Sequence, residues 1–294
     1  MLWEDDMTRY TLRGAVAALV DVATLAAGPP ASASPQPVFN PPKAYYLALG
    51  DSVTYGFQSA KWFPGAPPTL FNTGYVDGFA DLLKLIRPEI TTVNYGCPGE
   101  STASFLTGPC GVRAAGLVLH DDYVGSQADT AVAFLRSHRG QVSPITVALW
   151  GNDVRLFVGS CAGDFDCIRD RAPAAIAQIA ANLGTILGLL RAAAPDAEII
   201  VTGAWSTFIG SFDLADPLIM MLNEEMARTA SSERARFADV FPVFNPQGDP
   251  VAETAAICAL TLLCTQGDSH PSDTGYQAIA EALFDVSDYA RVDA

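Results

Sequence analysis

The feature that most constrains the fold is an apolar, β-prone run that ends abruptly in Gly-Asp-Ser. Residues 45–49 read Tyr-Tyr-Leu-Ala-Leu and lead directly into Gly50, Asp51 and Ser52. Glycine permits a tight turn, and Asp and Ser favour turns and helix N-caps. The pattern predicts a buried strand that delivers Ser52 to a strand-to-helix turn, where open α/β sheets bind ligands. Ser52 is then either a nucleophile, if a base reaches it, or simply the cap of the next helix.

Beyond this turn, predicted strands alternate with predicted helices. Such alternation indicates βαβ units and a parallel sheet with helices on both faces. The 294 residues, 50% of them hydrophobic, suit one globular domain or at most two small ones. The later expected strands are residues 91–95, 145–150, 197–203 and 236–243, and the expected helices are residues 75–86, 126–138, 172–194, 216–231 and 273–284.

The charge balance argues against two classes of partner. The formal net charge is -15, and the 17 Lys and Arg residues form no cluster. Nucleic acids and anionic membrane surfaces both require a basic face on the protein that binds them. We therefore expect no nucleic-acid partner and no attraction to an anionic membrane. No pattern in the sequence specifies the oligomeric state.

The N-terminus is typical of a secretory signal peptide, expected to occupy residues 1–33 and to start at Met7. Two arginines precede a mostly apolar stretch at residues 14–27, and Ala-Ser-Ala at residues 31–33 matches a cleavage site. The apolar stretch is short for a membrane span and two prolines follow it, so we expect no stable membrane anchor. Residues 34–43 are Pro-rich and predict an extended lead-in. The mature protein is thus expected to be secreted and extracellular.

Six cysteines, all in the exported part, indicate disulfides rather than a metal site. An even number of cysteines after a signal peptide is the pattern of a disulfide framework, and six allow fifteen pairings in principle. Zinc is the rival interpretation, but the sequence has no C-x-x-C and no H-E-x-x-H and only 3 histidines, so no metal is expected. The spacing suggests three local pairs: Cys97–Cys110, Cys161–Cys167 and Cys258–Cys264.

Polar residues recur where successive predicted strands end. Because the C-terminal ends of parallel strands share one edge of a sheet, these residues should meet there. Together they supply a nucleophile, a base and hydrogen-bond donors, which acyl transfer requires. The residues are Ser52 after the first strand, Asn94 and Gly99 at the second, Asn152 and Asp153 after the third, and Asp268, Ser269 and His270 before the last helix.

Here the chain resembles the SGNH (GDSL-type) hydrolases over about residues 45–284. The resemblance implies a flavodoxin-like three-layer α/β/α sandwich with a five-stranded parallel sheet, here a single domain over residues 44–294. It also implies hydrolysis of carboxylic esters and lipids. No P-loop and no dinucleotide-binding motif is present, so no cofactor is implied. The four matching blocks, in family order, are Gly50-Asp51-Ser52, Asn94 with Gly99, Gly151-Asn152-Asp153, and His270-Pro271.

The resemblance assigns a role to each block. Ser52 would be the nucleophile and His270 the base that takes its proton. The backbone N–H groups of Ser52 and Gly99, with the side-chain amide of Asn152, would form the oxyanion hole. The two other histidines, His120 and His138, have no predicted strand end beside them.

The acid departs from the family pattern. The family places it three residues before the histidine, where this chain has Gly267, whereas Asp268 stands only two residues before His270. Two arrangements follow from this. Either Asp268 orients the imidazole from a shifted loop, or a backbone carbonyl near Gly267 does so and the site is a dyad.

Several alternatives stay open at this point. Ser101 lies in Gly-Glu-Ser-Thr-Ala, which nearly matches a G-x-S-x-G elbow and makes it a rival nucleophile. The apolar loop at residues 57–72 either walls a substrate pocket or plugs the core. With residues 156–158 it favours a small-molecule or lipid ester with a lipophilic acyl chain. A carbohydrate deacetylase and a non-catalytic secreted binding module are the alternatives, and intact Ser52 and His270 argue against the second. Acyl-chain length and leaving group are not specified.

Overall fold

The protein was analysed as a computed structural model that describes residues 35–208 and 214–292. The expected signal peptide, residues 1–33, lies outside the described residues. The Pro-rich lead-in runs without helix or strand from residue 35 to residue 43. It is attached to the domain, because the Val38 N–H donates to the Arg234 carbonyl at 3.0 Å and the Asn40 amide donates to the Asp196 carbonyl.

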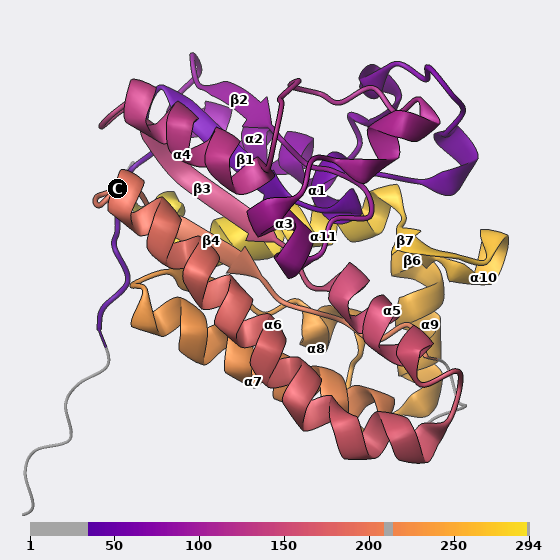
Figure 1. Ribbon diagram of the computed structural model, residues 1–294. Coiled ribbons are helices and arrows are strands. Elements are labelled where there is room, and N and C mark those ends of the chain that lie inside the picture. The colour runs from indigo at the N-terminus through magenta and orange to yellow at the C-terminus, as the bar shows by residue number, and fades with distance from the viewer. Residues whose placement is uncertain (1–34, 209–213, 293–294) are drawn as a thin grey trace, which may run out of the picture. The chain divides into compact units, whose positions relative to one another are not determined.

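A five-stranded parallel sheet forms the centre of the domain, as the strand–helix alternation predicts (Figure 1). The spatial order is β2-β1-β3-β4-β5, the flavodoxin-like order. β1 lies between β2 and β3, so that Leu47 pairs with Val93 on one side and Ile145 on the other. The strands are β1 (Tyr45–Gly50), β2 (Thr91–Asn94), β3 (Val142–Ala148), β4 (Ile199–Thr202) and β5 (Arg236–Ala238).

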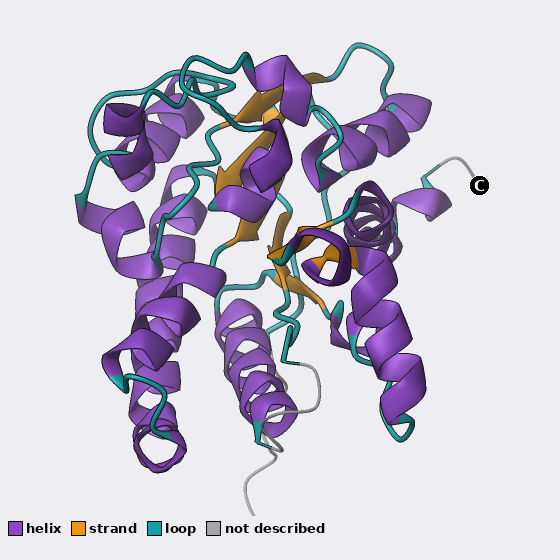
Figure 2. Ribbon diagram, turned by 90° about the vertical axis from the view of Figure 1, so that its right-hand side faces the viewer, coloured by secondary structure: helices purple, strands orange, loops and turns teal. Residues whose placement is uncertain are grey.

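Helices cover both faces of this sheet (Figure 2). Right-handed crossovers put the helix between β1 and β2 on one face and the next three crossover helices on the other. The first face carries α2 (Tyr75–Ile86) and α11 (Asp273–Ser287), which pack against each other. The second face carries α4 (Gln127–Ser137), α6 (Phe165–Ala193) and α7 (Ala215–Ser232), with α6 between the other two. The three-layer α/β/α architecture expected from the sequence is therefore confirmed.

Shorter elements follow the strand ends and build the functional edge. α1 (Ser52–Tyr55) follows β1, α3 (Thr102–Thr107) follows β2 and α5 (Gly151–Ser160) follows β3. A small antiparallel hairpin, separate from the main sheet, comes just before α11. The hairpin strands are β6 (Thr261–Leu262) and β7 (Asp268–Pro271), and its neighbours are α8 (Phe241–Phe244), α9 (Pro250–Leu260) and α10 (Leu263–Gln266).

Several predicted boundaries differ from the structure, and two of them, the start of α6 and the end of β5, differ by five residues or more. α6 begins at Phe165 rather than at residue 172, because the Asp164 side chain caps the N–H groups of Asp166 and Cys167 and starts the helix earlier. Pro173, which the sequence suggested as the helix start, lies inside α6. The strand expected at residues 236–243 ends at Ala238, because α8 begins at Phe241.

The six cysteines are joined in the structure as Cys97–Cys110, Cys161–Cys167 and Cys258–Cys264, the pairs that their spacing suggests. The first bond joins the segment after β2 to the segment after α3. The second links the end of α5 to the first turn of α6, and the third links α9 to α10 beside the hairpin. The first and third bonds therefore lie near the C-terminal end of β2 and the hairpin, and the second holds α5 to α6.

α6 is long and apolar enough to cross a membrane by length and composition alone. A core helix of a water-soluble domain meets the same criterion. In this domain Leu183, Ile186 and Leu187 of α6 are fully buried. We therefore interpret α6 as the central helix of its layer.

The close approach of Gly50 to β3 gives a stability prediction. Gly50 has φ of +142°, and a Cβ there would lie 2.0 Å from the Ala148 carbonyl oxygen. Gly50→Ala is expected to lower the free energy of unfolding by at least about 2 kcal/mol, from backbone strain and overpacking together. Urea unfolding measures the change. The control is Gly159→Ala in α5, where a Cβ meets nothing within 4 Å; a Gly50 variant as stable as this control would contradict the packing argument.

Candidate active site

The Gly-Asp-Ser turn frees Ser52 from a capping role. Asp51, not Ser52, is the N-cap of α1, and its Oδ1 accepts the Val53 N–H at 2.8 Å. The Gln127 side chain holds the backbone of Gly50 through two hydrogen bonds. Its Oε1 accepts the Gly50 N–H at 2.7 Å, and its Nε2 donates to the Gly50 carbonyl at 3.0 Å. Ser52 begins the helix, so its hydroxyl is not needed for the cap.

Ser52 lines a cavity of about 340 Å³ at the C-terminal edge of the sheet. Asn152 from the start of α5 and His270 from β7 line the same cavity. Ser52 and Asn152 are each 9% exposed, so both residues are nearly buried where they line the cavity. Apolar and aromatic side chains form much of the remaining wall, namely Val53, Trp150, Val154, Val158, Trp205, Phe208 and Ile219.

Asp268 contacts the imidazole of His270. Its Oδ1 lies 2.5 Å from His270 Nδ1 and also accepts the His270 backbone N–H at 3.1 Å. The two residues belong to β7, and side chains two apart in a strand point to the same face. The two-residue spacing therefore suits a strand. The structure has the carboxylate, rather than a carbonyl near Gly267, at Nδ1.

The segment after α1 supports this pair, although no sequence pattern pointed to it. The Ser59 N–H donates to Asp268 Oδ2 at 2.8 Å. The Gln58 amide donates to the Pro271 carbonyl at 3.0 Å, and the Phe57 ring packs edge-on against the His270 ring at 5.0 Å. These three residues thus link Asp268, His270 and Pro271 of the hairpin to the segment that follows α1.

The loop at residues 57–72 does not form the wall that was one of its two expected roles. None of its residues is among the described residues that line the cavity. Phe71 is fully buried and stacks on Phe57, which agrees with the core-plug alternative. Phe63, at the other extreme, is 53% exposed.

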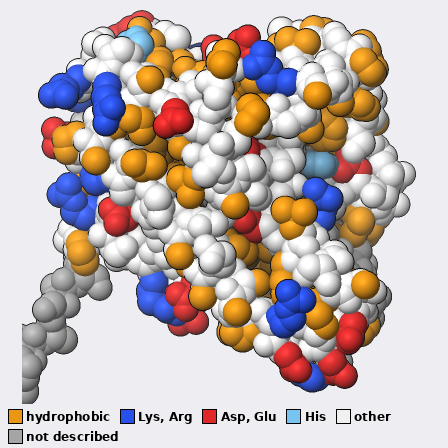
Figure 3. Space-filling model, in the orientation of Figure 1, with side chains coloured by type: hydrophobic (Ala, Val, Ile, Leu, Met, Phe, Trp, Pro, Cys, Tyr) orange, Lys and Arg blue, Asp and Glu red, His pale blue; other side chains and the backbone are white. Residues whose placement is uncertain are grey.

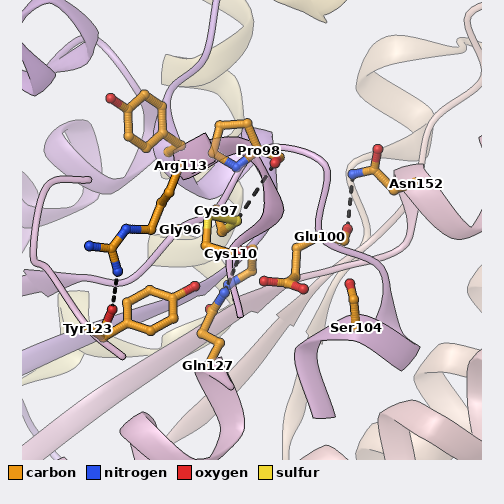
Figure 4. The surroundings of a disulfide bond; sticks show 12 residues. Gly96, Cys97, Pro98, Glu100, Ser104, Cys110, Arg113, Tyr123, Gln127 and Asn152 are labelled. Carbon is orange, nitrogen blue, oxygen red and sulfur yellow. Dashed lines mark hydrogen bonds between the residues drawn. A yellow bond between two sulfur atoms is a disulfide. The ribbon is translucent and has the colours of Figure 1, made fainter. Parts of the chain in front are cut away.

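Asn152 is oriented by the segment that follows Gly99. Its Nδ2 donates to the Glu100 carbonyl at 2.9 Å, a contact drawn in Figure 4, and lies 3.4 Å from Asp51 Oδ2. Gly99 has φ of +88°, a conformation that favours glycine. Gly99 itself is not among the described cavity-lining residues, but the next peptide carbonyl is the one that holds the Asn152 amide.

Two buried carboxyls border the site. Burial raises the pKa of Asp51 to about 7, although the Val53 N–H partly opposes this. Burial likewise raises the pKa of Glu100 to about 7, partly offset by Ser104 and Gln127. Figure 4 shows the Glu100 carboxyl on the side of its backbone opposite to Asn152, facing Ser104, Gln127 and Tyr123.

Asp268 behaves in the opposite way. Burial alone would raise the pKa of Asp268, but hydrogen bonds from the His270 ring and the Ser59 N–H outweigh burial and hold it well below the usual range. Asp268 is therefore ionised at neutral pH and only accepts hydrogen bonds. His270 Nδ1 must then carry the proton between them, which leaves Nε2 as the basic nitrogen.

Three further side chains are placed away from the cavity. Ser101 is the N-cap of α3 and forms a capping box with Ser104, so its resemblance to a nucleophile elbow has a structural explanation. His120 Nε2 lies 3.0 Å from the Tyr55 carbonyl, and His138 Nδ1 contacts the Phe134 carbonyl. Of the three histidines, all in the described residues, His270 alone lines the cavity with Ser52.

Within the described ranges, no three His, Cys, Asp or Glu side chains lie close enough together to form a metal site.

Comparison with known proteins supplies the family and the fold relatives. Residues 48–278 match the model of the GDSL-like lipase/acylhydrolase family. A search of curated proteins found no match. Similar solved structures include phospholipase A1 from Streptomyces albidoflavus, with 17% identity, 83% of this chain and 99% of that chain covered, and a TM-score of 0.56.

Two other solved structures resemble the chain to a similar degree. The extracellular lipase from Streptomyces rimosus has 18% identity, a TM-score of 0.54, and coverage of 83% of this chain and 99% of that one. An acetyl xylan esterase from Geobacillus stearothermophilus has 18% identity, a TM-score of 0.53, and coverage of 84% and 96%. At such identities these structures establish a shared fold.

The buried Glu100 carboxyl predicts how stability depends on pH. Its pKa is raised in the folded state, so the folded protein holds a proton that the unfolded chain releases above about pH 4.5. The stability that this proton contributes is complete below that pH and is lost as pH rises through about 7. Glu100→Gln should therefore shrink the fall in unfolding free energy between pH 5 and pH 8 by on the order of 2 kcal/mol.

Urea unfolding at the two pH values measures this difference. Glu281→Gln, on the exposed side of α11, is the matched control and should keep the wild-type pH dependence. An unchanged pH dependence in Glu100→Gln would mean that the carboxyl is ionised in the folded protein.

Proposed function

The chain belongs to the GDSL-like lipase/acylhydrolase family, and on that premise we propose that it is a secreted serine esterase or lipase with Ser52 as nucleophile. The observation that carries the proposal is that Ser52, Asn152 and His270 line one cavity while Asp268 contacts His270 Nδ1. This set contains a nucleophile, a base, an orienting acid and an oxyanion donor.

The proposed reaction begins with attack of Ser52 Oγ on the ester carbonyl carbon. His270 Nε2 takes the hydroxyl proton and then gives it to the departing alkoxide, which leaves as an alcohol. Water, deprotonated by the same nitrogen, then attacks the acyl-serine and releases the carboxylic acid. Asp268 keeps the proton on Nδ1 and stabilises the imidazolium that forms in each step.

The negative charge that develops on the carbonyl oxygen requires donors. We assign the backbone N–H groups of Ser52 and Gly99 and the Asn152 amide to this role. One hydrogen of Nδ2 is held by the Glu100 carbonyl, which orients the amide, and the 3.4 Å contact to Asp51 is long enough for an oxyanion to replace. A donor fixed in advance is worth about 10²–10³ in kcat.

The lining of the cavity favours a lipophilic ester. Trp205 packs edge-on against Trp150 and is 4% exposed, so its faces are used in packing rather than offered to a sugar. A carbohydrate deacetylase remains the second candidate, because an acetyl xylan esterase is among the structures that share the fold. The third, a non-catalytic binding module, would not need the contact between Asp268 and His270.

Export is part of the proposal. The expected signal peptide, three disulfides and the likeness to an extracellular lipase support secretion. Disulfides persist in oxidising compartments and are rare in the cytosol. The ester substrate is the only partner that the proposal requires.

The nucleophile is tested by covalent labelling. A fluorophosphonate probe should label Ser52, and Ser52→Ala should abolish both labelling and hydrolysis of p-nitrophenyl butyrate. The control is Ser101→Ala, which removes the α3 cap at a cost of about 1 kcal/mol of stability but should keep the label. Substantial turnover by folded Ser52→Ala would overturn the assignment.

The acid is tested by Asp268→Asn. An amide at this position donates to Nδ1 and favours the wrong imidazole tautomer, so kcat should fall on the order of 10⁴-fold. Asp285→Asn, an exposed position on α11, is the control and should keep the wild-type kcat. A near-normal kcat in folded Asp268→Asn would assign the orienting role to a carbonyl near Gly267.

A further inference from the structure

A second cavity, of about 190 Å³, adjoins the proposed active site. Three helices each give it one apolar face: α5 contributes positions 154, 157 and 158, and α7 contributes positions 215, 218, 219 and 222. The largest share comes from α6, at positions 165, 168, 172, 175, 176 and 179, whose spacing marks a single helical face. We call this cavity, with Gly163 and Phe208 completing its lining, the α5–α7 chamber.

The chamber has no charged or hydrogen-bonding side chain among its described lining residues. Water in a cavity needs two to four polar partners, so water does not suit this one. Phe165 and Phe208 of the lining are 50% and 46% exposed, so the chamber opens to solvent, and a ligand that covers its apolar surface removes that surface from water. Small side chains at Ala172 and Ala175 keep the space open where larger ones would fill it. Hydrophobic side chains are visible between α5 and α6 on the face drawn in Figure 3.

The chamber adjoins the cavity that holds Ser52. Val154, Val158 and Ile219 line both, as does Phe208. The side chains that the two cavities share are all apolar, so the border between them is apolar. This shared apolar border points to an occupant that is part of the substrate rather than a separate ligand.

We propose that the α5–α7 chamber binds the acyl chain of the ester and selects medium-length chains over acetyl groups. The inference rests on the proposed function and names its substrate class. An apolar cavity of about 150 Å³ holds a six-carbon ring, so the chamber accommodates a chain of about eight carbons. With the first carbons in the Ser52 cavity, the best substrates carry about ten to twelve acyl carbons.

The test compares p-nitrophenyl esters from acetyl to hexadecanoyl, below their solubility limits. Each buried methylene should raise kcat/KM about fourfold until the chamber is full, and longer chains should add nothing. The measured quantity is the ratio of kcat/KM for the decanoyl ester to that for the acetyl ester. The eight additional methylenes predict a ratio on the order of 10⁴, and a ratio below about 100 would contradict burial of the chain.

Ala175→Phe places a ring in the chamber and should lower this ratio at least tenfold, with the optimum moved to shorter chains. Ala175→Leu fills less space and should give an intermediate ratio. Ala174→Phe is the matched control, because Ala174 is the exposed neighbour on α6 and is not among the chamber residues. Its ratio should stay within twofold of wild type.

Calorimetry of decanoate binding to the full-length protein separates the two proposals. The chamber predicts that decanoate binds wild type and Ala174→Phe at least tenfold more tightly than Ala175→Phe. If wild type hydrolyses short esters but the ratio is equal in all variants, the chamber is not the acyl site and the esterase proposal stands. If no ester is hydrolysed, the esterase proposal fails, and the calorimetry alone supports or overturns binding of an acyl chain.

Discussion

The close contact between β1 and β3 is the constraint on which the rest of the site depends. A side chain on Gly50 would clash with the Ala148 carbonyl oxygen, so only glycine fits where the ends of β1 and β3 lie side by side. α1 and α5 leave the sheet from these two ends, which brings Ser52 and Asn152 to one cavity. The Gln127 amide hydrogen-bonds to both backbone groups of Gly50, whose carbonyl also accepts the Cys97 N–H at 3.0 Å.

His270, the proposed base, reaches the cavity by a different route. It is on a hairpin outside the main sheet, so hydrogen bonds from another segment, rather than strand pairing with the main sheet, connect it to the turn that carries Ser52. Gln58 and Ser59 connect the segment after α1 to Pro271 and Asp268. One short segment therefore links the Gly-Asp-Ser turn to the hairpin, because it continues the first and contacts the second.

The parallel sheet with helices on both faces and the polar residues at the strand ends were predictable from the residues, because period, turn residues and parallel connectivity act locally. The flavodoxin-like order of the strands was expected only from the resemblance to the SGNH hydrolases. The start of α6 was not predictable from the apolar pattern, because its N-cap, Asp164, lies outside that pattern. Pro173 suggested that the helix begins there, but Pro173 lies inside α6. The partners of Asp268 and the α5–α7 chamber could not be predicted either. Ser59 acts through its backbone N–H, which every residue but proline has, and a cavity is a property of three helices packed together.

The hairpin also bears on how such sites change in evolution. A carboxylate reaches Nδ1 here from two residues upstream, because the strand β7 turns both side chains to one face. What selection must conserve is then the position of an oxygen atom, while the place of its residue in the chain is free to drift when the local backbone changes. A motif search that requires a fixed spacing between the carboxylate and the histidine will miss chains in which a different local backbone brings the same two groups together.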